Sequence, residues 1–200
     1  DGEFRIPLLG KFNVSNVLAV ICCLGVMGCP ISEMQGAVEA MVGVKGRMQV
    51  ISRKGQPLVL VDYAHTPDAL ENVLVELRAR CSGNIWCMFG CGGGRDKGKR
   101  ALMGTVAEQY ADKIVLTEDN SRGESVTEIL HQIRSGVSKQ AVIHEIEDRA
   151  EAIAYVVQSA AIDDIVLLAG RGHEQYMLTD GQRIPFEDEE VACRALKHWC

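Results

Sequence analysis

From residue 58 to the end of the chain, short apolar runs rich in Val, Ile and Leu alternate with longer stretches of helical period. Parallel strands need helix-length crossovers between them, and strands buried on both faces read as continuous apolar runs. The alternation therefore predicts a mostly parallel sheet with helices on both faces. The predicted strands are residues 58–62, 85–89, 113–117, 141–145 and 164–169, and the predicted helices are residues 67–79, 98–110, 124–136 and 147–160.

The chain after the fifth strand has a different pattern. Residues 176–178 and 183–186 are separated by the turn sequence Thr179-Asp180-Gly181, which predicts a hairpin and, from it, one antiparallel edge strand. A last helix is expected over residues 187–198. The expected fold class is therefore α/β, a Rossmann-like, mostly parallel sheet with one antiparallel edge strand and helices on both faces.

The first 46 residues lack the strand–helix alternation. They predict a short strand that ends at Leu9 and two helices, over residues 13–28 and 32–42. Two helices and one strand bury too little surface for a stable domain of that length. Residues 1–46 are therefore expected to be the helical tail of a preceding domain, joined by a linker at residues 43–47 to a second domain at residues 47–200.

Composition excludes several classes of protein. A net charge of −6 argues against a general nucleic-acid binder, because phosphate contacts need a basic surface. The longest apolar stretch, residues 17–27, is shorter than the roughly 20 residues that cross a bilayer, and the chain starts without a signal-peptide pattern. The eight cysteines show no paired spacing, so thiols in a reducing cytoplasm are expected, with no metal site.

In open parallel sheets, ligands bind at the carboxyl ends of the strands. The first loop there, residues 62–68, places Thr66 as the N-cap of a helix and Pro67 at its first position. Asp62, at the end of the strand, could accept hydrogen bonds from sugar hydroxyls. A well-made turn and helix cap is the alternative interpretation.

The second loop, residues 90–100, is rich in glycine and carries four basic residues at a helix start. Cations there oppose the helix dipole, which favours a bound carboxylate or phosphate over a solvated run of charges. The spacing GxxxxGK is present, but Arg100 follows it where a P-loop has Ser or Thr. The dinucleotide pattern fails because Arg95 takes the place of its third glycine. Neither an NTP site nor an NAD site is expected at this loop.

The third and fourth loops, residues 118–124 and 170–174, each carry carboxylates and an arginine. An amino acid needs a cation for its carboxylate and an acid for its ammonium group, so the two loops together could hold a zwitterion. Surface ion pairs are the alternative for each loop taken singly.

Four motifs in these loops resemble one family of proteins. The motifs are DYAHTPD at residues 62–68, GCGG at 90–93, DNSR at 119–122 and GRGHE at 170–174, and their order and spacing resemble the Mur ligases, in the branch that adds the third amino acid of peptidoglycan. FNVSN at residues 12–16 and GRM at 46–48 also resemble that family. The resemblance covers essentially the whole chain.

This resemblance implies an ATP-dependent amide ligase. Such an enzyme phosphorylates the carboxylate of UDP-N-acetylmuramoyl-L-alanyl-D-glutamate, and the amino group of the incoming amino acid then attacks the acyl phosphate. By this likeness, residues 1–46 end the central ATPase domain and residues 47–200 form the C-terminal domain. The residues implied to lie near ATP are Asn16, Arg47, Asp62 and His65. The P-loop, the Mg²⁺ ligands and the catalytic residues would precede residue 1, so this chain alone is expected to be an inactive monomer.

The resemblance also implies the incoming amino acid. Relatives that add meso-diaminopimelate carry a DNPR motif whose arginine meets a ligand carboxylate, and Arg122 stands in that position. The amino-acid site implied is Arg95, Asp119, Asn120, Ser121, Arg122, Gly170 and Glu174. Ser121 replaces the usual Pro, and Gly94 replaces an Asp. Both changes give the loops more conformational freedom, which is lost when a ligand binds and so lowers the expected affinity. A lysine-adding homologue, a folylpolyglutamate synthetase-like ligase and a non-catalytic α/β binding module are the alternatives.

Overall fold

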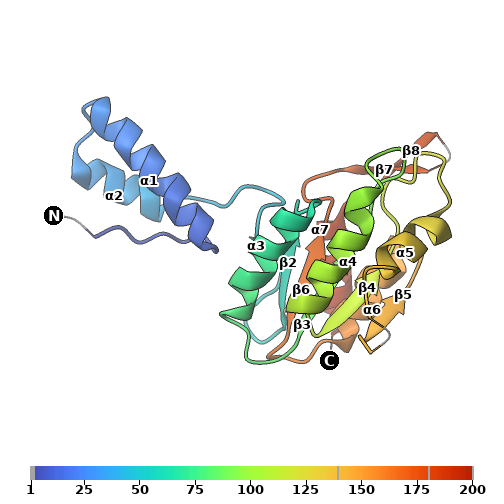
Figure 1. Ribbon diagram of the computed structural model, residues 1–200. Helices are drawn as coiled ribbons and strands as arrows, with labels where there is room; N and C mark the ends of the chain where they lie inside the picture. The colour runs from blue at the N-terminus through green and yellow to red at the C-terminus, as the bar shows by residue number, and fades with distance from the viewer. Residues whose placement is uncertain (1–2, 139, 180, 200) are drawn as a thin grey trace. The chain divides into compact units, whose positions relative to one another are not determined.

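The structure, a computed structural model, describes residues 3–138, 140–179 and 181–199 (Figure 1). The chain forms two compact units, Asp1–Val44 and Lys45–Cys200. The predicted turn residue Asp180 lies outside the described residues.

The first unit contains two helices, α1 (Lys11–Val26) and α2 (Ile31–Glu39). The predicted strand ending at Leu9 is wrong, since residues 3–9 form no strand and no strand of the described unit offers them a hydrogen-bonding edge. Val17 is the buried residue of α1. The exposed apolar side chains of α1 and the turn after it include Leu18, Val20, Val26 and Met27.

The second unit is built on a six-stranded sheet in the order β1-β2-β6-β3-β4-β5. Its strands are β1 (Gln49–Val50), β2 (Leu58–Asp62), β3 (Ile85–Phe89), β4 (Lys113–Leu116), β5 (Ile143–Glu145) and β6 (Ile165–Ala169). All neighbouring pairs are parallel except β1 with β2, so the predicted fold class is confirmed.

The antiparallel edge strand does not come from the predicted hairpin. The hairpin exists as β7 (Tyr176–Thr179) and β8 (Gln182–Pro185), but it forms a separate two-stranded sheet. The edge is instead occupied by β1, whose Gln49 and Val50 pair with Val61 and Leu60. Two residues are too short a segment to show the alternation that identifies a strand in sequence.

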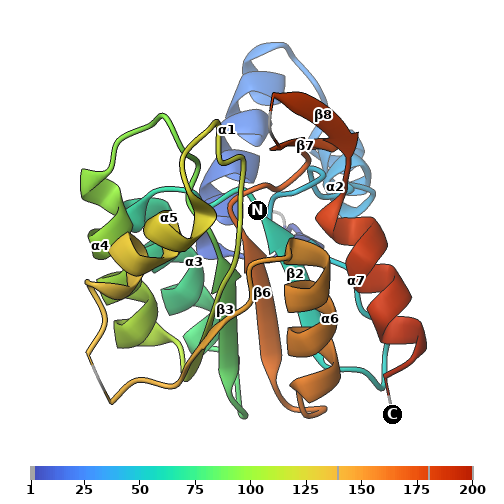
Figure 2. The same ribbon diagram turned by 90° about the vertical axis from the view of Figure 1, so that its right-hand side faces the viewer.

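Helices cover both faces of the sheet (Figure 2). On one face lie α3 (Pro67–Arg78), α4 (Gly98–Tyr110) and α5 (Val126–Arg134), and on the other lie α6 (Arg149–Ser159) and α7 (Asp188–Lys197). Side-chain caps fix three of the helix starts: Thr66, Ser125 and Asp148 accept hydrogen bonds from the N–H groups of the first turns of α3, α5 and α6. The predicted cap at Thr66 and the predicted Pro67 at the first helical position are thus confirmed.

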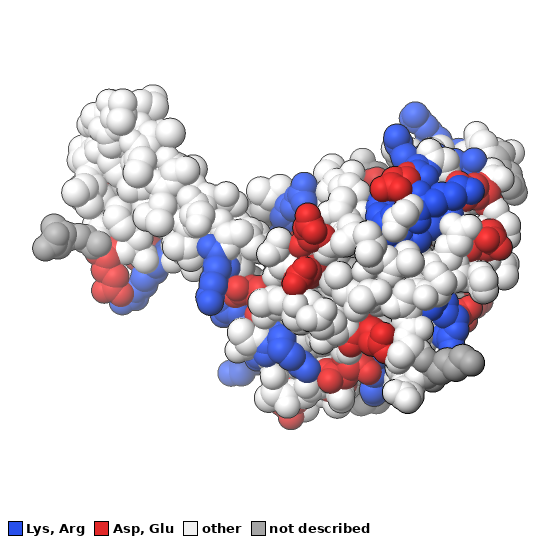
Figure 3. Space-filling model, in the orientation of Figure 1, with Lys and Arg blue, Asp and Glu red and all other residues white. Residues whose placement is uncertain are grey.

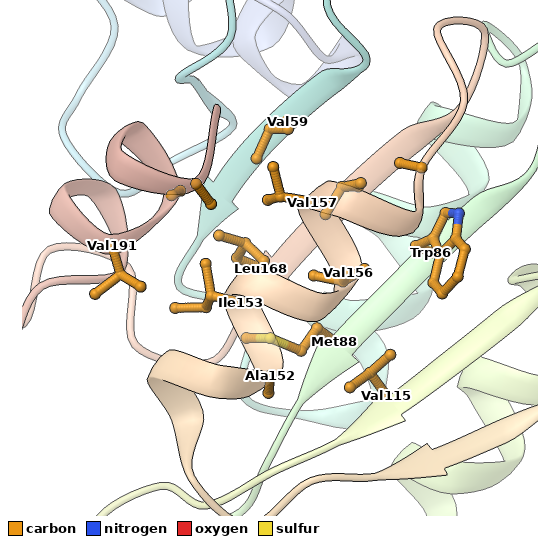
Figure 4. Packing of buried hydrophobic residues seen from close by; sticks show 14 of the residues in the cluster. Val59, Trp86, Met88, Val115, Ala152, Ile153, Val156, Val157, Leu168 and Val191 are labelled. Atoms are coloured by element: carbon orange, nitrogen blue, oxygen red, sulfur yellow. The ribbon is translucent and has the colours of Figure 1, made fainter. Parts of the chain in front are cut away.

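The core between the sheet and the α6–α7 face is apolar and closely packed (Figure 4). Residues from β2, β3, β4 and β6 meet one side of α6 and α7. The residues seen there are Val59, Trp86, Met88, Val115 and Leu168 from the sheet, Ala152, Ile153, Val156 and Val157 from α6, and Val191 from α7. Because every residue of β3 and β6 is buried, both strands read as continuous apolar runs.

The strand order brings four loops to one edge of the sheet. β6 lies between β2 and β3, and the chain leaves β6 toward the hairpin and α7, whereas it leaves β2 and β3 toward the opposite face. In register, Asp62 pairs with Ala169 and Phe89 pairs with Leu116, so the four parallel strands end at nearly the same level. A crevice where successive connections diverge in this way is the usual ligand site of an open parallel sheet.

Candidate functional site

Asn120, on the loop after β4, is buried. Its Nδ2 donates to Glu174 Oε2 at 3.0 Å. Its Oδ1 accepts from the backbone N–H of Leu178 at 2.7 Å and from Arg171 Nη1 at 3.4 Å. One amide side chain therefore ties the loop after β4 to the loop after β6 and to the hairpin.

Gly170 lies against the carboxylate of Asp119, whose side chain is 13% exposed. The backbone of Gly170 has φ +109°, and a Cβ at this position would lie 3.4 Å from Asp119 Oδ2. Its N–H donates to the carbonyl oxygen of Asp62 at 3.1 Å, which links the ends of β6 and β2. A side chain at residue 170 would be strained and would crowd the acid.

The glycine-rich loop after β3 packs its backbone against the loop after β4. The Gly93 N–H donates to the carbonyl oxygen of Asn120 at 2.9 Å, and a Cβ at Gly93 would overlap the carbonyl oxygen of Ser121. A Cβ at Gly90 would likewise overlap the carbonyl oxygen of Thr117. The glycines are thus required for contact between two loops of the protein itself.

Two of the four basic residues at the start of α4 share one carboxylate. Arg100 is fully buried and donates to Glu124 Oε2 at 2.9 Å, and Lys97 lies 3.5 Å from the same oxygen. Lys99 donates to the carbonyl oxygen of His65 at 2.7 Å. The hydrogen bond from Arg100, with a second one from the Gly94 N–H, lowers the pKa of Glu124 to about 2. One carboxylate thus meets two of the four cations, and a bound anion at this loop stays a prediction.

Two guanidinium groups remain without a carboxylate. Arg95 is exposed and has no polar partner among the described residues, and the exposed Arg122 donates only to the carbonyl oxygens of Gly93 (3.4 Å) and Asn120 (3.3 Å). Arg122 also has φ 47°, in the left-handed region that non-glycine residues seldom adopt. Figure 3 shows Lys and Arg side chains, with acidic ones among them, gathered over the end of α4 next to β7 and β8.

Three arginines are among the largest fully buried side chains of the unit, and each holds loops of the site together from beneath. Arg100 also donates to the carbonyl oxygen of Gly92. Arg149 forms an ion pair with Asp188 at 2.6 Å and donates to the carbonyl oxygens of Glu118 and Ala169, where β4 and β6 end.

Arg171 is the third buried arginine and touches three of the predicted site residues. Its Nη1 lies 3.6 Å from Asp119 Oδ1, 3.4 Å from Glu174 Oε2 and 3.4 Å from Asn120 Oδ1. The structural roles of Arg149 and Arg171 were missed in the sequence. For Arg149 a signal was available, because this residue stands at the first position of α6, where a cation opposes the helix dipole unless it is paired.

The predicted nucleotide residues of the second unit surround the end of β2. Asp62 is buried, and its two oxygens accept from the N–H groups of Met48 (2.7 Å) and Ala64 (2.8 Å). Burial raises the pKa of Asp62, while these two hydrogen bonds and the charge of Arg47 oppose the rise. The Asp62 carboxylate thus closes the local turn by accepting two N–H groups. A carboxylate has roughly four lone-pair sites, so about two are left over for a ligand hydroxyl.

Aromatic rings and one cation lie beside Asp62. The ring of Tyr63 is 4.6 Å from that of His65 and 5.6 Å from that of His173, and the guanidinium of Arg47 lies 4.9 Å above the Tyr63 ring. Arg47, His65 and His173 are exposed. Asn16 lies on α1 in the first unit, where its Nδ2 donates to Asn13 Oδ1 at 3.3 Å, and its place near adenine stays a prediction.

Asp62, His65 and Arg47 carry the hydrogen-bonding and charged groups that a ribose and phosphates would need, and their contact with ATP stays a prediction. No group of three or more His, Cys, Asp or Glu in the described part of the chain could hold a metal ion.

Among residues 3–138, 140–179 and 181–199, no helix is long and apolar enough to cross a membrane.

Comparison with known proteins identifies the family. Residues 46–172 match the family model described as Mur ligase, glutamate ligase domain. Two curated proteins named UDP-N-acetylmuramoyl-L-alanyl-D-glutamate--2,6-diaminopimelate ligase are similar along the chain. The one from Coxiella burnetii (strain RSA 493 / Nine Mile phase I) is 50% identical over 197 residues, which cover 98% of this chain and 40% of that protein. The one from Pseudomonas aeruginosa (strain PAO1) is 48% identical over 199 residues, which cover 100% of this chain and 41% of that protein.

A solved structure titled as a UDP-N-acetylmuramoyl-L-alanyl-D-glutamate--2,6-diaminopimelate ligase agrees in fold, with a TM-score of 0.77 and 41% identity. The match covers 97% of this chain and 40% of that one, so the chain spans about 40% of the length of the relatives it matches. The family model covers well over half of the chain, and the relatives are similar along essentially all of it. This chain belongs to the Mur ligase family.

Proposed function

We propose that the second unit holds meso-diaminopimelate between the loops after β3, β4 and β6, and this proposed site is called the pocket below. The observation that carries this proposal is the pair of exposed guanidinium groups, Arg95 and Arg122, that have no carboxylate partner within the described chain. The proposed amino-acid site consists of Arg95, Asp119, Asn120, Ser121, Arg122, Gly170 and Glu174.

The chemistry of the pocket suits this ligand. Arg95 and Arg122 would receive carboxylates, and Asp119 and Glu174 would receive an ammonium group. meso-Diaminopimelate carries two carboxylates and lysine carries one, so lysine would leave one guanidinium unpaired. Because Arg122 is exposed, the resulting discrimination is smaller than a buried arginine would give.

For the whole protein we propose ATP-dependent ligation. The carboxylate of UDP-N-acetylmuramoyl-L-alanyl-D-glutamate is activated as an acyl phosphate, the amino group of meso-diaminopimelate attacks the acyl carbon, and phosphate leaves as the amide forms. The proposal is supported by the names of the two relatives, which join these two substrates.

The part of the chain near β2 is proposed to form one wall of the ATP site, with Asn16 near adenine, Asp62 and His65 at the nucleoside and Arg47 at the phosphates. Mg²⁺ would be held by residues outside this chain. Residues 1–46 are proposed to end the ATPase domain and residues 47–200 to form the amino-acid-binding domain of a monomeric, cytoplasmic enzyme.

A two-dimensional NMR titration of this chain tests the amino-acid site. Saturable shifts with meso-diaminopimelate are expected, weaker shifts with L-lysine, and loss of the response in Arg122→Ala but not in Arg53→Ala, which removes an exposed arginine outside these loops. Equal binding of lysine would favour a lysine-adding relative. Tighter binding of L-glutamate would favour a folylpolyglutamate synthetase-like ligase, and no response to any of the three would refute an amino-acid site on this chain.

A further inference from the structure

Arg171 is fully buried, yet its guanidinium reaches the floor of the proposed amino-acid pocket. A single nitrogen, Nη1, lies within 3.6 Å of Asp119, Asn120 and Glu174. Of these three residues, two lie on the loop after β4 and one on the loop after β6. The contacts set the distance between the two carboxylates that the proposed function assigns to the ligand's ammonium group.

The guanidinium also contacts the hairpin and α7. Its Nη2 donates to the carbonyl oxygen of Tyr176 at 2.6 Å, and its Nε, which is buried without a hydrogen-bond partner, lies 3.9 Å from Asp188 Oδ1. The ring of Phe186 is 5.6 Å from the guanidinium carbon. Asp188 is itself held by Arg149, which pairs with it at 2.6 Å. Arg171 therefore contacts the hairpin and α7 as well as both loops.

The position of Arg171 also sets the charge of the pocket floor. The side chains of Asp119 and Glu174 are only 13% and 32% exposed, so their mutual repulsion is poorly screened. One buried cation between two carboxylates leaves one net negative charge, which one ammonium group neutralises. Without that cation, repulsion would raise the pKa of one carboxyl group.

We infer that Arg171 is a positioning residue that fixes Asp119, Asn120 and Glu174 and places one positive charge between the two carboxylates, so that this end of the proposed site accepts one ammonium group. The inference rests on the proposed function, because it assumes that the ammonium group binds at these carboxylates. Arg171 contacts the ligand only through the residues that it holds.

Other charged groups face this cluster and stay in place when Arg171 is replaced. They come from α6, α7 and the loop after β4, and they are Arg149, Asp188 and Glu118. These groups are present in the wild-type chain and in each variant. A change in the pH dependence of ligand affinity on replacing Arg171 therefore reports the removal of the Arg171 charge.

The test measures the affinity of the chain for meso-diaminopimelate at pH 5.5 and pH 7.5, in the wild type and in Arg171→Met. The wild-type affinity is expected to be nearly constant. In Arg171→Met, affinity should rise at least about threefold from pH 5.5 to pH 7.5, because removal of the cation favours the protonated form of one carboxyl group at the lower pH. A loss of packing alone would weaken binding equally at both pH values.

Two further variants control for folding. Arg100→Met removes another fully buried arginine that touches neither Asp119 nor Glu174, and it should keep the wild-type ratio of affinities. Arg171→Lys keeps the charge, so its ratio should return to the wild-type value. Its affinity at pH 7.5 should still be about threefold to tenfold weaker, because an ammonium group cannot reproduce the fork of contacts to Asn120 and Tyr176.

A measurement without ligand separates this inference from the proposed function. Carbon-detected NMR titration of Asp119 and Glu174 should show a higher pKa for at least one of them in Arg171→Met than in the wild type. Unchanged carboxyl pKa values, or full wild-type affinity in Arg171→Lys, would overturn the role of Arg171 even if the wild type binds the amino acid. Failure of the wild type to bind, with the carboxyl shift present, would instead overturn the proposed function.

Discussion

Asn120 and Glu174, which are 54 residues apart in the sequence, are joined by a hydrogen bond of 3.0 Å from the side-chain amide of the first to the carboxylate of the second. The bond requires a donor at Asn120 Nδ2, since a carboxylate offers only acceptors. An aspartate of the same size could not replace Asn120 unless its carboxyl group were protonated.

Asn120→Asp should destabilise the chain at neutral pH. It would place a second carboxylate against Glu174, at a cost of about 1–3 kcal/mol in the free energy of unfolding. The loss should shrink at pH 4.5, where a protonated Asp can donate again. Urea denaturation at pH 7 and pH 4.5 measures this, and Asn120→Ala, which has no proton to gain, should lose a similar amount at both pH values.

Arg122 should be a position where glycine is more stable than alanine. Its φ of 47° costs a side-chain-bearing residue about 1 kcal/mol, which glycine avoids. We expect Arg122→Gly to exceed Arg122→Ala in thermal stability, with neither variant binding meso-diaminopimelate. At Arg194, exposed within α7, the order should reverse, because glycine weakens a helix interior. The same order at both positions would contradict a strained Arg122.

Gly46 should tolerate substitution far less well than Gly55. Both have positive φ, +71° and +91°, but a Cβ at Gly46 would overlap the backbone of Gly172 and His173, whereas a Cβ at Gly55 would meet open space. Gly55→Ala should cost about 1 kcal/mol, and Gly46→Ala about 2–4 kcal/mol. Chemical denaturation of both variants compares the costs, and equal losses would mean that the Gly46 contact is easily relaxed.

Glu124 should contribute to stability in a defined range of pH. The hydrogen bond from Arg100 lowers the pKa of Glu124 from 4.5 to about 2, so the stabilisation is complete above 4.5 and is lost as the pH falls toward 2. In Glu124→Gln, stability at pH 7 should drop and its decline between pH 4.5 and 2 should flatten. Glu190→Gln, at an exposed position of α7, should leave the shape of that profile unchanged in a pH-dependent denaturation series.

Much of the fold could be predicted because parallel strands that are buried on both faces have continuous apolar sequences. The predicted strands at residues 58–62 and 85–89 match β2 and β3 residue for residue, and the helix predicted at 98–110 matches α4. The edge strand β1 could not be foreseen, because its two residues pair only after β2 has been placed.

The loops of the candidate site could be predicted from the sequence, but the buried arginines that hold these loops together could not. Strand ends point to the loops that carry Asp119 and Glu174, and the structure brings these two residues to the same buried arginine. The burial of Arg100, Arg149 and Arg171 depends on partners from distant segments, which no local pattern records. For the same reason the sequence does not show that Glu124 pairs with two of the four cations at the start of α4.

The place of β6 between β2 and β3 has a consequence for synthesis on the ribosome. Ile165 pairs with Leu58 on one side and with Ile85 on the other, so the strand that closes the middle of the sheet is the last of the six to be made. Until it leaves the exit tunnel, β2 and β3 each present an unpaired edge to other nascent chains. Those two edges therefore stay open to wrong pairing until β6 has been made, although β2 and β3 are complete much earlier.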